Sequence, residues 1–342
     1  MACENIYGSK DYSNRFAYTM SFTTYVTSWG TDPVSQVKDM VAKGALKPGS
    51  RVALAFASFN FDGTSYIPGL GGMTMDTVRS FISVVRSAGG KASLSIGGAT
   101  YPFAGSDLYA QPGFLASNID TVLTTCGFDG VDFDIEDSYS TVPANFAFTA
   151  SSLINTLRSL NPGLYISLTT PAQAWSTGMY QQNLLNLTIG SLDCWQPMEY
   201  DLWIDPAHTY LQQVQWDVDY YMKNWSVASS KIVLGLMPGA DDMGHVLSLQ
   251  DALNLTSYAK SAGLQGVMTW DLNNDAAGVA GNAPYAYTMA LQAMLRPVKA
   301  TAHGIGCGAR CRCGCGAPCG CGCRRDLLQL KFRSPLLRGL SR

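Results

Sequence analysis

The stretch from Cys126 to Ser140, "CGFDGVDFDIEDSYS", sets acidic side chains in a hydrophobic run, although only 14% of the residues of this 342-residue chain are charged. Asp132, Asp134 and Glu136 recur there at every second position. Carboxyl groups crowded into a low-dielectric interior cannot all ionise at low cost, so at least one keeps its proton near neutral pH. A retained proton is what a general acid needs. The spacing therefore predicts acid–base chemistry.

A period of two predicts a β-strand, because side chains on a strand alternate between its faces. The carboxyl groups would share one face, and the apolar residues between them would share the other. A solvated acidic loop is a weaker alternative, since the flanking residues are apolar at the strand period. A calcium-binding loop is also disfavoured, because Asp137 stands where such a loop needs glycine. We expect no metal and no cofactor.

The elements that must carry these carboxyl groups alternate between strands and helices. Runs rich in β-branched and aromatic residues, typical of strands, begin at eight positions: Tyr18, Arg51, Lys91, Gly127, Tyr165, Leu192, Lys231 and Leu264. Predicted helices lie at residues 75–88, 142–160, 210–225 and 249–262, and a helix at 283–295 closes the domain. Eight such units in about 280 residues predict an α/β fold, a (β/α)8 TIM barrel. An open doubly wound sheet is less favoured, because no strand is followed by G-x-G-x-x-G.

Barrel enzymes keep their active sites at the C-terminal mouth of the strands. The row of carboxyl groups would climb toward that mouth, with Glu136 nearest to the substrate. Aromatic rings at or just beyond strand ends could stack on a substrate there. The candidates are Tyr25, Phe59, Trp175 and Trp203.

The chain is expected to hold one large domain, at residues 18–297, after an N-terminal lead at residues 1–17. Residues 298–342 form a tail in which seven of the ten cysteines crowd between Cys307 and Cys323. Closely spaced cysteines can bind soft metals. The glycine, cysteine and arginine composition is equally that of read-through of GC-rich DNA or a gene-model error. We expect the tail to be disordered or artefactual and to lie outside the fold.

Charge and hydropathy exclude several classes of partner. The formal net charge is −2, without a basic run in the body of the chain, so we expect no nucleic-acid partner. No apolar run is long enough for a membrane span, and no signal peptide is visible. Three sequons, at Asn186, Asn224 and Asn254, would suit a secreted protein. We expect a monomer.

The acidic stretch contains "DGVDFDIE", which resembles the D-G-x-D-x-D-x-E signature of glycoside hydrolase family 18, the chitinases and their relatives. "SIGG" at residues 95–98 is similar to the family's S-x-G-G motif on the third strand. "QPMEYD" at residues 196–201 looks like its Q-x-M-x-Y-D motif on the sixth. Trp270 stands where the family places a tryptophan on the eighth strand. The resemblance covers residues from about 18 to 297.

This resemblance implies an endo-acting, retaining chitinase that hydrolyses β-1,4-linked N-acetylglucosamine by substrate-assisted catalysis. Glu136 would protonate the glycosidic oxygen, and the 2-acetamido oxygen of the substrate would attack the anomeric carbon. Asp134 would orient the acetamide and share a proton with Asp132. Tyr200 would hydrogen-bond the acetamide oxygen. Because the implied substrate is extracellular, the resemblance favours an extracellular location.

The substrate-binding residues expected from the motifs and strand ends are Trp270, Asp201, Met198, Gln196, Tyr25 and Phe59. Two departures from the family's pattern indicate which members of the family the chain resembles. Asp137 follows Glu136 where many members have Trp or Tyr, which looks more like the plant-type and fungal-bacterial short chitinases. The link at residues 238–263, between the seventh and eighth predicted strands, has room for a helix but not for the extra domain of larger chitinases. An open, shallow cleft is implied.

Two other functions stay open. An endo-β-N-acetylglucosaminidase acting on N-glycans would use the same catalytic residues. A chitinase-like lectin would share the fold without cleaving its ligand, because fold alone does not define function.

Overall fold

The computed structural model describes residues 20–61, 66–103, 111–138, 140, 142–173 and 180–296. The chain divides into two units, Met1–Val298 and Lys299–Arg342. The expected lead at residues 1–17 and the tail at residues 298–342 lie outside the described residues, as does Trp175.

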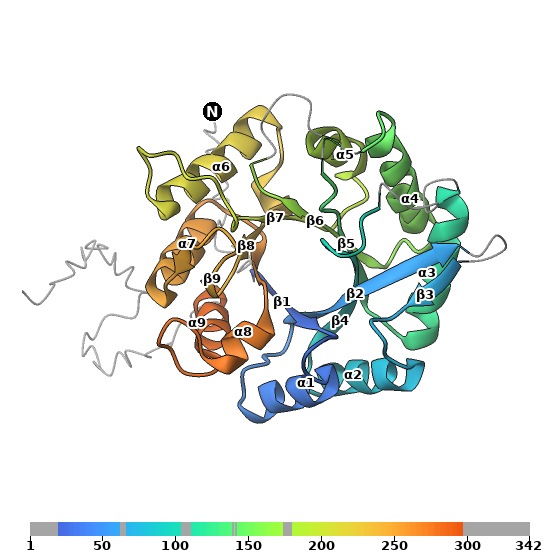
Figure 1. Ribbon diagram of the computed structural model, residues 1–342, viewed down its shortest axis with the longest axis horizontal. Coiled ribbons are helices and arrows are strands. Elements are labelled where there is room, and N and C mark those ends of the chain that lie inside the picture. The colour runs from blue at the N-terminus through green and yellow to red at the C-terminus, as the bar shows by residue number, and fades with distance from the viewer. Residues whose placement is uncertain are drawn as a thin grey trace, which may run out of the picture. The chain divides into compact units, whose positions relative to one another are not determined.

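Eight parallel strands form the closed barrel that the sequence predicts (Figure 1). They are β1 (Ser21–Thr27), β2 (Arg51–Phe61), β4 (Lys91–Gly97), β5 (Gly130–Asp134), β6 (Tyr165–Pro171), β7 (Cys194–Met198), β8 (Val233–Leu236) and β11 (Gly266–Thr269). Strand β1 closes the barrel because it pairs in parallel with both β2 and β11. The (β/α)8 prediction is confirmed.

Helices surround the strands (Figure 1). They are α1 (Pro33–Ala42), α2 (Met75–Ser87), α3 (Pro112–Cys126), α4 (Phe146–Leu160), α5 (Tyr180–Thr188), α6 (Tyr210–Asn224), α7 (Leu249–Ser261), α8 (Leu272–Ala277) and α9 (Ala286–Leu295). Helix α4 begins at Phe146 rather than at the expected residue 142. Pro143 disfavours helical geometry at residue 142. In the described part of the chain, no helix has the length and apolar character that a membrane span requires.

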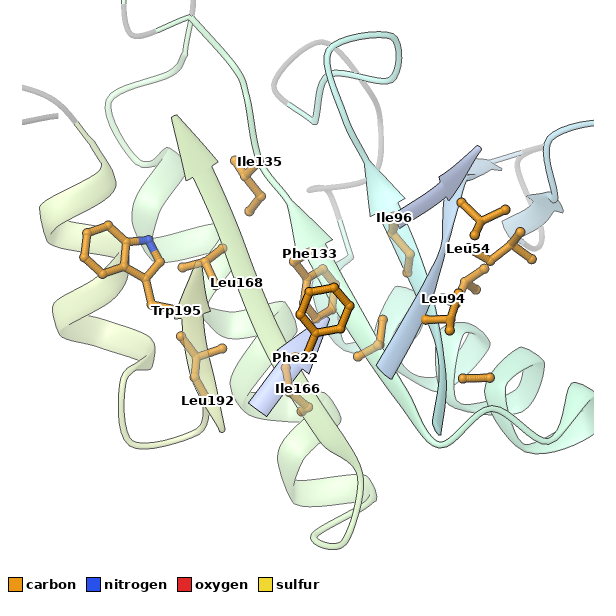
Figure 2. Packing of buried hydrophobic residues seen from close by; sticks show 14 of the residues in the cluster. Phe22, Leu54, Leu94, Ile96, Phe133, Ile135, Ile166, Leu168, Leu192 and Trp195 are labelled. Atoms are coloured by element: carbon orange, nitrogen blue, oxygen red, sulfur yellow. The ribbon is translucent and has the colours of Figure 1, made fainter. Parts of the chain in front are cut away.

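The main core lies between the strands and the helices. The apolar residues that alternate with the carboxyl groups of β5 point into this layer, as predicted, and Val131 and Phe133 are fully buried. Figure 2 shows part of this layer, with Leu94, Phe133 and Leu168 from neighbouring strands. Polar side chains on the other face of the same strands are thereby directed to the barrel interior.

Three short strands were not expected from the sequence. Strand β3 (Tyr66–Gly69) pairs antiparallel with the end of β2, and β9 (Gly239–Ala240) pairs with β10 (Val246–Leu247). Only the β9–β10 hairpin and α7 occupy the link from β8 to β11, which is described throughout. The predicted absence of an extra domain in this link is confirmed.

Gly97 on β4 pairs in register with Asp134 on β5. Gly97 has φ +108°, a region that disfavours side chains. A Cβ atom at this position would overlap the carbonyl oxygen of Asp134 and the ring of Phe103. Glycine is therefore required beside Asp134.

We predict that Gly97→Ala destabilises the barrel by more than about 2 kcal/mol, because it adds backbone strain to a clash with main-chain atoms. Gly113→Ala on α3 is the matched control, since an added Cβ there would meet no atom within 4 Å and the residue does not have a left-handed φ. Urea unfolding should show a loss of stability only for Gly97→Ala. Equal stability of the two variants would contradict this account of the β4–β5 approach.

Candidate active site

Asp132 lies at the centre of the barrel interior, 1% exposed. Its neighbours in register on β4 and β6 are Ser95 and Ser167, and their hydroxyl groups donate to its carboxylate at 2.8 and 2.7 Å. Tyr25 donates at 2.8 Å and Thr169 at 2.9 Å. The strand register thus surrounds one carboxyl group with hydroxyl donors from both sides.

A fifth donor to Asp132 is the amide of Gln196 on β7, at 3.2 Å. The same amide donates to the Tyr25 hydroxyl at 2.9 Å. Burial raises the pKa of Asp132, and its hydrogen bonds from hydroxyl groups act in the opposite direction. Burial and the nearby carboxylates raise the pKa of Tyr25 well above its usual value, so it remains a neutral donor.

Asp134 is held differently, although it lies two residues further along the same strand. It is 2% exposed, and its Oδ1 atom has no hydrogen-bond partner. Burial is the main cause that raises its pKa well above the usual value, followed by the charges of Glu136 and Asp132. A proton shared by Asp132 and Asp134 should therefore reside mainly on Asp134.

Glu136 lies two residues past the end of β5, not within the strand, and is only partly buried. Burial raises its pKa to about 7. The backbone N–H of Ala99 lowers this pKa, whereas the carboxylates of Asp201 and Asp137 raise it. Glu136 is therefore a carboxyl group that can hold or release its proton near neutral pH.

Tyr200 and Asp201 follow β7, which is separated from β5 by β6 alone. Burial and then the charges of Asp134 and Glu136 raise the pKa of Tyr200, which keeps its hydroxyl proton. Asp201 has a left-handed backbone, φ 56°. That conformation is held by its own N–H, which donates to Asp241 at 2.9 Å, and by its side chain, which accepts from the N–H of Asp242 at 2.6 Å.

Aromatic rings form a third side of the site. Trp270 stacks on Phe56 with 5.4 Å between ring centroids, and Phe56 stacks on Trp29 with 5.9 Å. Tyr25 meets Trp270 edge-on at 5.7 Å. Trp29 is 51% exposed, so this row of rings runs from the barrel interior to the surface.

These groups converge on one cavity of about 340 Å³. It is lined by Trp29, Phe56, Ala99, Thr100, Asp134, Glu136, Pro171, Ala172, Met198, Tyr200, Asp201, Leu202, Asp242 and Trp270. Among the described residues of its lining, the ionisable groups are four carboxyl groups and one phenol, and none is cationic. A second cavity, of about 200 Å³, shares Thr100 with the first and is lined in part by Phe59 and Tyr101.

The structure brings most of the expected site residues together. Asp134, Glu136, Met198, Tyr200, Asp201 and Trp270 line the main cavity. Asp132, Tyr25 and Gln196 lie beneath it in the buried hydrogen-bond network, and Phe59 lines the second cavity. Trp203 is 57% exposed and lines neither of these two cavities. Within the described residues, no cluster of three or more His, Cys, Asp and Glu side chains could hold a metal ion.

Sequence reasoning missed Trp29, Phe56 and the N–H of Ala99. Trp29 lies two residues beyond β1, where a ring at a strand end was a usable signal. Phe56 lies within β2, and the sequence of this strand resembles that of a core strand. The Ala99 contact comes from the main chain, so the residue type carries no signal for it.

Barrel, carboxyl row and cavity together define the architecture of a glycoside hydrolase. The chain belongs to glycosyl hydrolases family 18, whose family model matches residues 21–245. Comparison with curated proteins gave no match.

Solved structures share this fold. The catalytic domain of a hyperthermophilic chitinase from Pyrococcus furiosus is 19% identical, with TM-score 0.63, over 81% of this chain and 95% of that chain. A GH18 chitinase from Cycas revoluta in complex with (GlcNAc)3 is 14% identical, with TM-score 0.62, over 80% and 99%. A chitinase-like agglutinin from Robinia pseudoacacia is 15% identical, with TM-score 0.60, over 80% and 99%.

We predict that Asp201→Asn makes Glu136 lose its proton at a lower pH, because it removes a negative charge that raises the pKa of Glu136. The chain contains three glutamates, Glu4, Glu136 and Glu199, so labelling with δ-¹³C glutamate gives few carboxyl signals to resolve. The Glu136 signal, assigned with Glu136→Gln, should titrate near pH 7 in the unmodified protein. Asp76→Asn, which removes an exposed carboxyl group of α2, should leave that titration unchanged.

Proposed function

We propose that this protein is a retaining, endo-acting chitinase that hydrolyses β-1,4-linked N-acetylglucosamine polymers by substrate-assisted catalysis. The observation that carries the proposal is the pairing, in one cavity, of Asp134 with an unpartnered buried oxygen and Glu136 with a pKa of about 7. Membership of family 18 and the likeness to chitinase folds support the substrate class.

Asp134 supplies the acceptor that an acetamide needs. A buried oxygen without a partner costs free energy until a donor reaches it. The N–H of a 2-acetamido group would be such a donor, and the neutral hydroxyl of Tyr200 could bind the acetamide oxygen. These two contacts would hold that oxygen against the anomeric carbon. No separate protein nucleophile is then required.

Glu136 supplies the proton. In its protonated form it would donate to the glycosidic oxygen as the bond to the anomeric carbon breaks and the acetamide oxygen attacks. As a carboxylate it would then accept a proton from the water that opens the cyclic intermediate. Two displacements at one carbon return a product with retained configuration. As positive charge develops on the acetamide, the shared proton would move toward Asp132. The Asp134 carboxylate would then stabilise that positive charge.

The aromatic row and the second cavity support binding along a polymer. Trp270 would lie beneath the sugar at the cleavage point, and Trp29 extends an apolar surface outward from it. The second cavity continues the first through Thr100, so Phe59 could meet a more distant sugar. The link between β8 and β11 adds no domain that would enclose the cleft. An open groove of this kind suits attack within a chain.

A lectin is the second candidate, favoured by the likeness to the Robinia agglutinin. Such a protein would bind chito-oligosaccharide and release no product. The presence of Glu136, Asp134 and Tyr200 in one cavity favours the enzyme. An endo-β-N-acetylglucosaminidase would release glycan from a glycoprotein, and parallel assays on chitin oligomers and an N-glycoprotein separate it from a chitinase.

We predict that Glu136→Gln lowers kcat by roughly 10²–10⁴-fold, because the amide keeps the shape of the side chain but cannot donate the proton. Oligosaccharide binding, measured by calorimetry, should persist. Product release from chitin oligomers measures the rate, with Asp76→Asn as the control. A variant that keeps more than about a tenth of the original rate would rule out the general-acid role.

We also predict that cleavage requires an N-acetyl group on the sugar at the non-reducing side of the broken bond. A fully deacetylated oligomer of equal length should bind and resist hydrolysis, since it lacks the attacking oxygen. Proton NMR of the first product should show the β anomer. An initial α product, or equal rates on both oligomers, would contradict the substrate-assisted mechanism. Either result would still show that the protein is a hydrolase.

A further inference from the structure

Glu199 is a buried carboxyl group that the proposed reaction does not use. It lies between Met198 and Tyr200, which both line the main cavity, so its own side chain faces away from the cavity toward α6. Glu199 is 0% exposed, and neither carboxyl oxygen has a partner in standard hydrogen-bond geometry. An ionised carboxylate in this position would carry a desolvation cost of several kcal/mol.

Asp217 of α6 is the neighbouring carboxyl group, also 0% exposed. It accepts the side-chain amides of Gln213 at 3.1 Å and Gln173 at 3.2 Å. Tyr221 accepts the backbone N–H of Gln173 at 2.8 Å, so its own hydroxyl proton is directed elsewhere and acts on Glu199. Asp217 therefore has donors that stabilise its charge, whereas Glu199 has far fewer.

The titratable groups around Glu199 point to a retained proton. Burial first, and then the charge of Asp217, raise the pKa of Glu199 well above its usual value, while the Tyr221 hydroxyl lowers it. The Tyr210 hydroxyl of α6 donates to the backbone carbonyl of Glu199, and the Tyr258 hydroxyl of α7 donates to Asp219. Burial raises the pKa of each tyrosine, so both stay neutral. No lysine, arginine or histidine of the described residues acts on the Glu199 pKa.

The same polar cluster fixes the loop that leaves β7. The side chain of Gln173 bonds both the N–H and the carbonyl of Trp203, at 2.9 and 2.7 Å. Gln213 accepts the N–H of Asp205 at 3.1 Å. Because both glutamines also donate to Asp217, this carboxylate lies at the centre of the contacts that hold residues 203–205.

We propose that Glu199 and Asp217 share one proton as a buried carboxyl pair, and that this pair positions Tyr200 at the cavity. Asp217 is the ionised member and Glu199 the protonated one. With one proton the pair carries a single negative charge and avoids the repulsion between two buried carboxylates. The positioning of Tyr200 rests on the proposed function, but the shared proton does not.

The proton is tested by ¹³C NMR of protein labelled with δ-¹³C glutamate. The Glu199 signal, assigned with Glu199→Gln, should stay at its protonated position at pH values well above the ordinary pKa of about 4.3. Asp217→Asn should move its titration to lower pH, because it removes the neighbouring charge. A Glu199 signal that titrates near its ordinary value of about 4.3, or one that Asp217→Asn leaves unchanged, would overturn the pair.

Thermal unfolding gives an independent measure. A pKa that is raised in the folded state stabilises the protein fully below the unfolded pKa of about 4.3, and this stability is lost as the pH rises toward the folded pKa. Glu199→Gln has no carboxyl group at this position, so it does not lose this stability as the pH rises. Its Tm relative to the unmodified protein should rise by roughly 2–4 °C for each pH unit between pH 5 and 7. Asp76→Asn should show a constant difference, and a constant difference for Glu199→Gln would overturn the proposal.

The positioning role is tested at pH 6 with chitin oligomers. Glu199→Ala leaves Asp217 without its partner and should lower kcat/KM by roughly tenfold or more, whereas Glu199→Gln should stay within about threefold. If Glu199→Ala does not fold, Glu199→Met preserves the volume and takes its place. Unchanged kinetics in the alanine or methionine variant would remove the positioning role. Inactivity of the unmodified protein on these oligomers would refute the proposed function and leave the NMR result standing.

Discussion

The cost of burying carboxyl groups in the barrel interior is the constraint on which the rest of the site depends. Desolvation of a carboxylate costs several kcal/mol even after relaxation, and a hydrogen bond to a charged group returns about 1.5–3 kcal/mol. Five donors surround Asp132, whereas Oδ1 of Asp134 has none. The two carboxyl groups are therefore unequal although they share a strand face. Asp134, the member nearer the mouth, therefore retains a proton more readily than Asp132.

The barrel supplies this inequality through its register. Ser95 and Ser167 lie directly beside Asp132 on the flanking strands, where short hydroxyl side chains reach the carboxylate without filling the interior. One step higher, Gly97 lies beside Asp134 and offers no side chain at all. The same strands that stabilise a charge at one level thus leave an unpartnered oxygen at the next. A parallel sheet makes such a gradient possible, because each inward residue has its own pair of register neighbours on the flanking strands.

Much of this arrangement could be predicted from the sequence, because it follows from strong local patterns. The period-two alternation around Asp132 and Asp134 indicated the strand and its faces, and the repeated units indicated the barrel. Glu136 was expected on the strand but lies beyond it, since the end of a strand depends on pairing that no single segment reveals. Gln196 was expected to bind substrate, yet its amide lies in the network under Asp132. A motif identifies a residue without showing which layer of a site it occupies. The Phe56 ring could not be predicted, because its contact with Trp270 joins strands more than two hundred residues apart.

Strand β7 shows how one segment can serve both sides of the barrel wall. Its alternation sends Gln196, Met198 and Tyr200 inward, and Trp195 outward against Tyr221 of α6. Apolar side chains are the usual occupants of such outward positions, because they pack against helices. Glu199 breaks that pattern at a position directly beside Tyr200. Since a fully buried acid costs more than the leucine or methionine that would fill the same space, its presence requires a compensating interaction. In the proposed pair this interaction is the proton shared with Asp217. The glutamines that bind Asp217 tie the helix layer to the loop at the cavity rim.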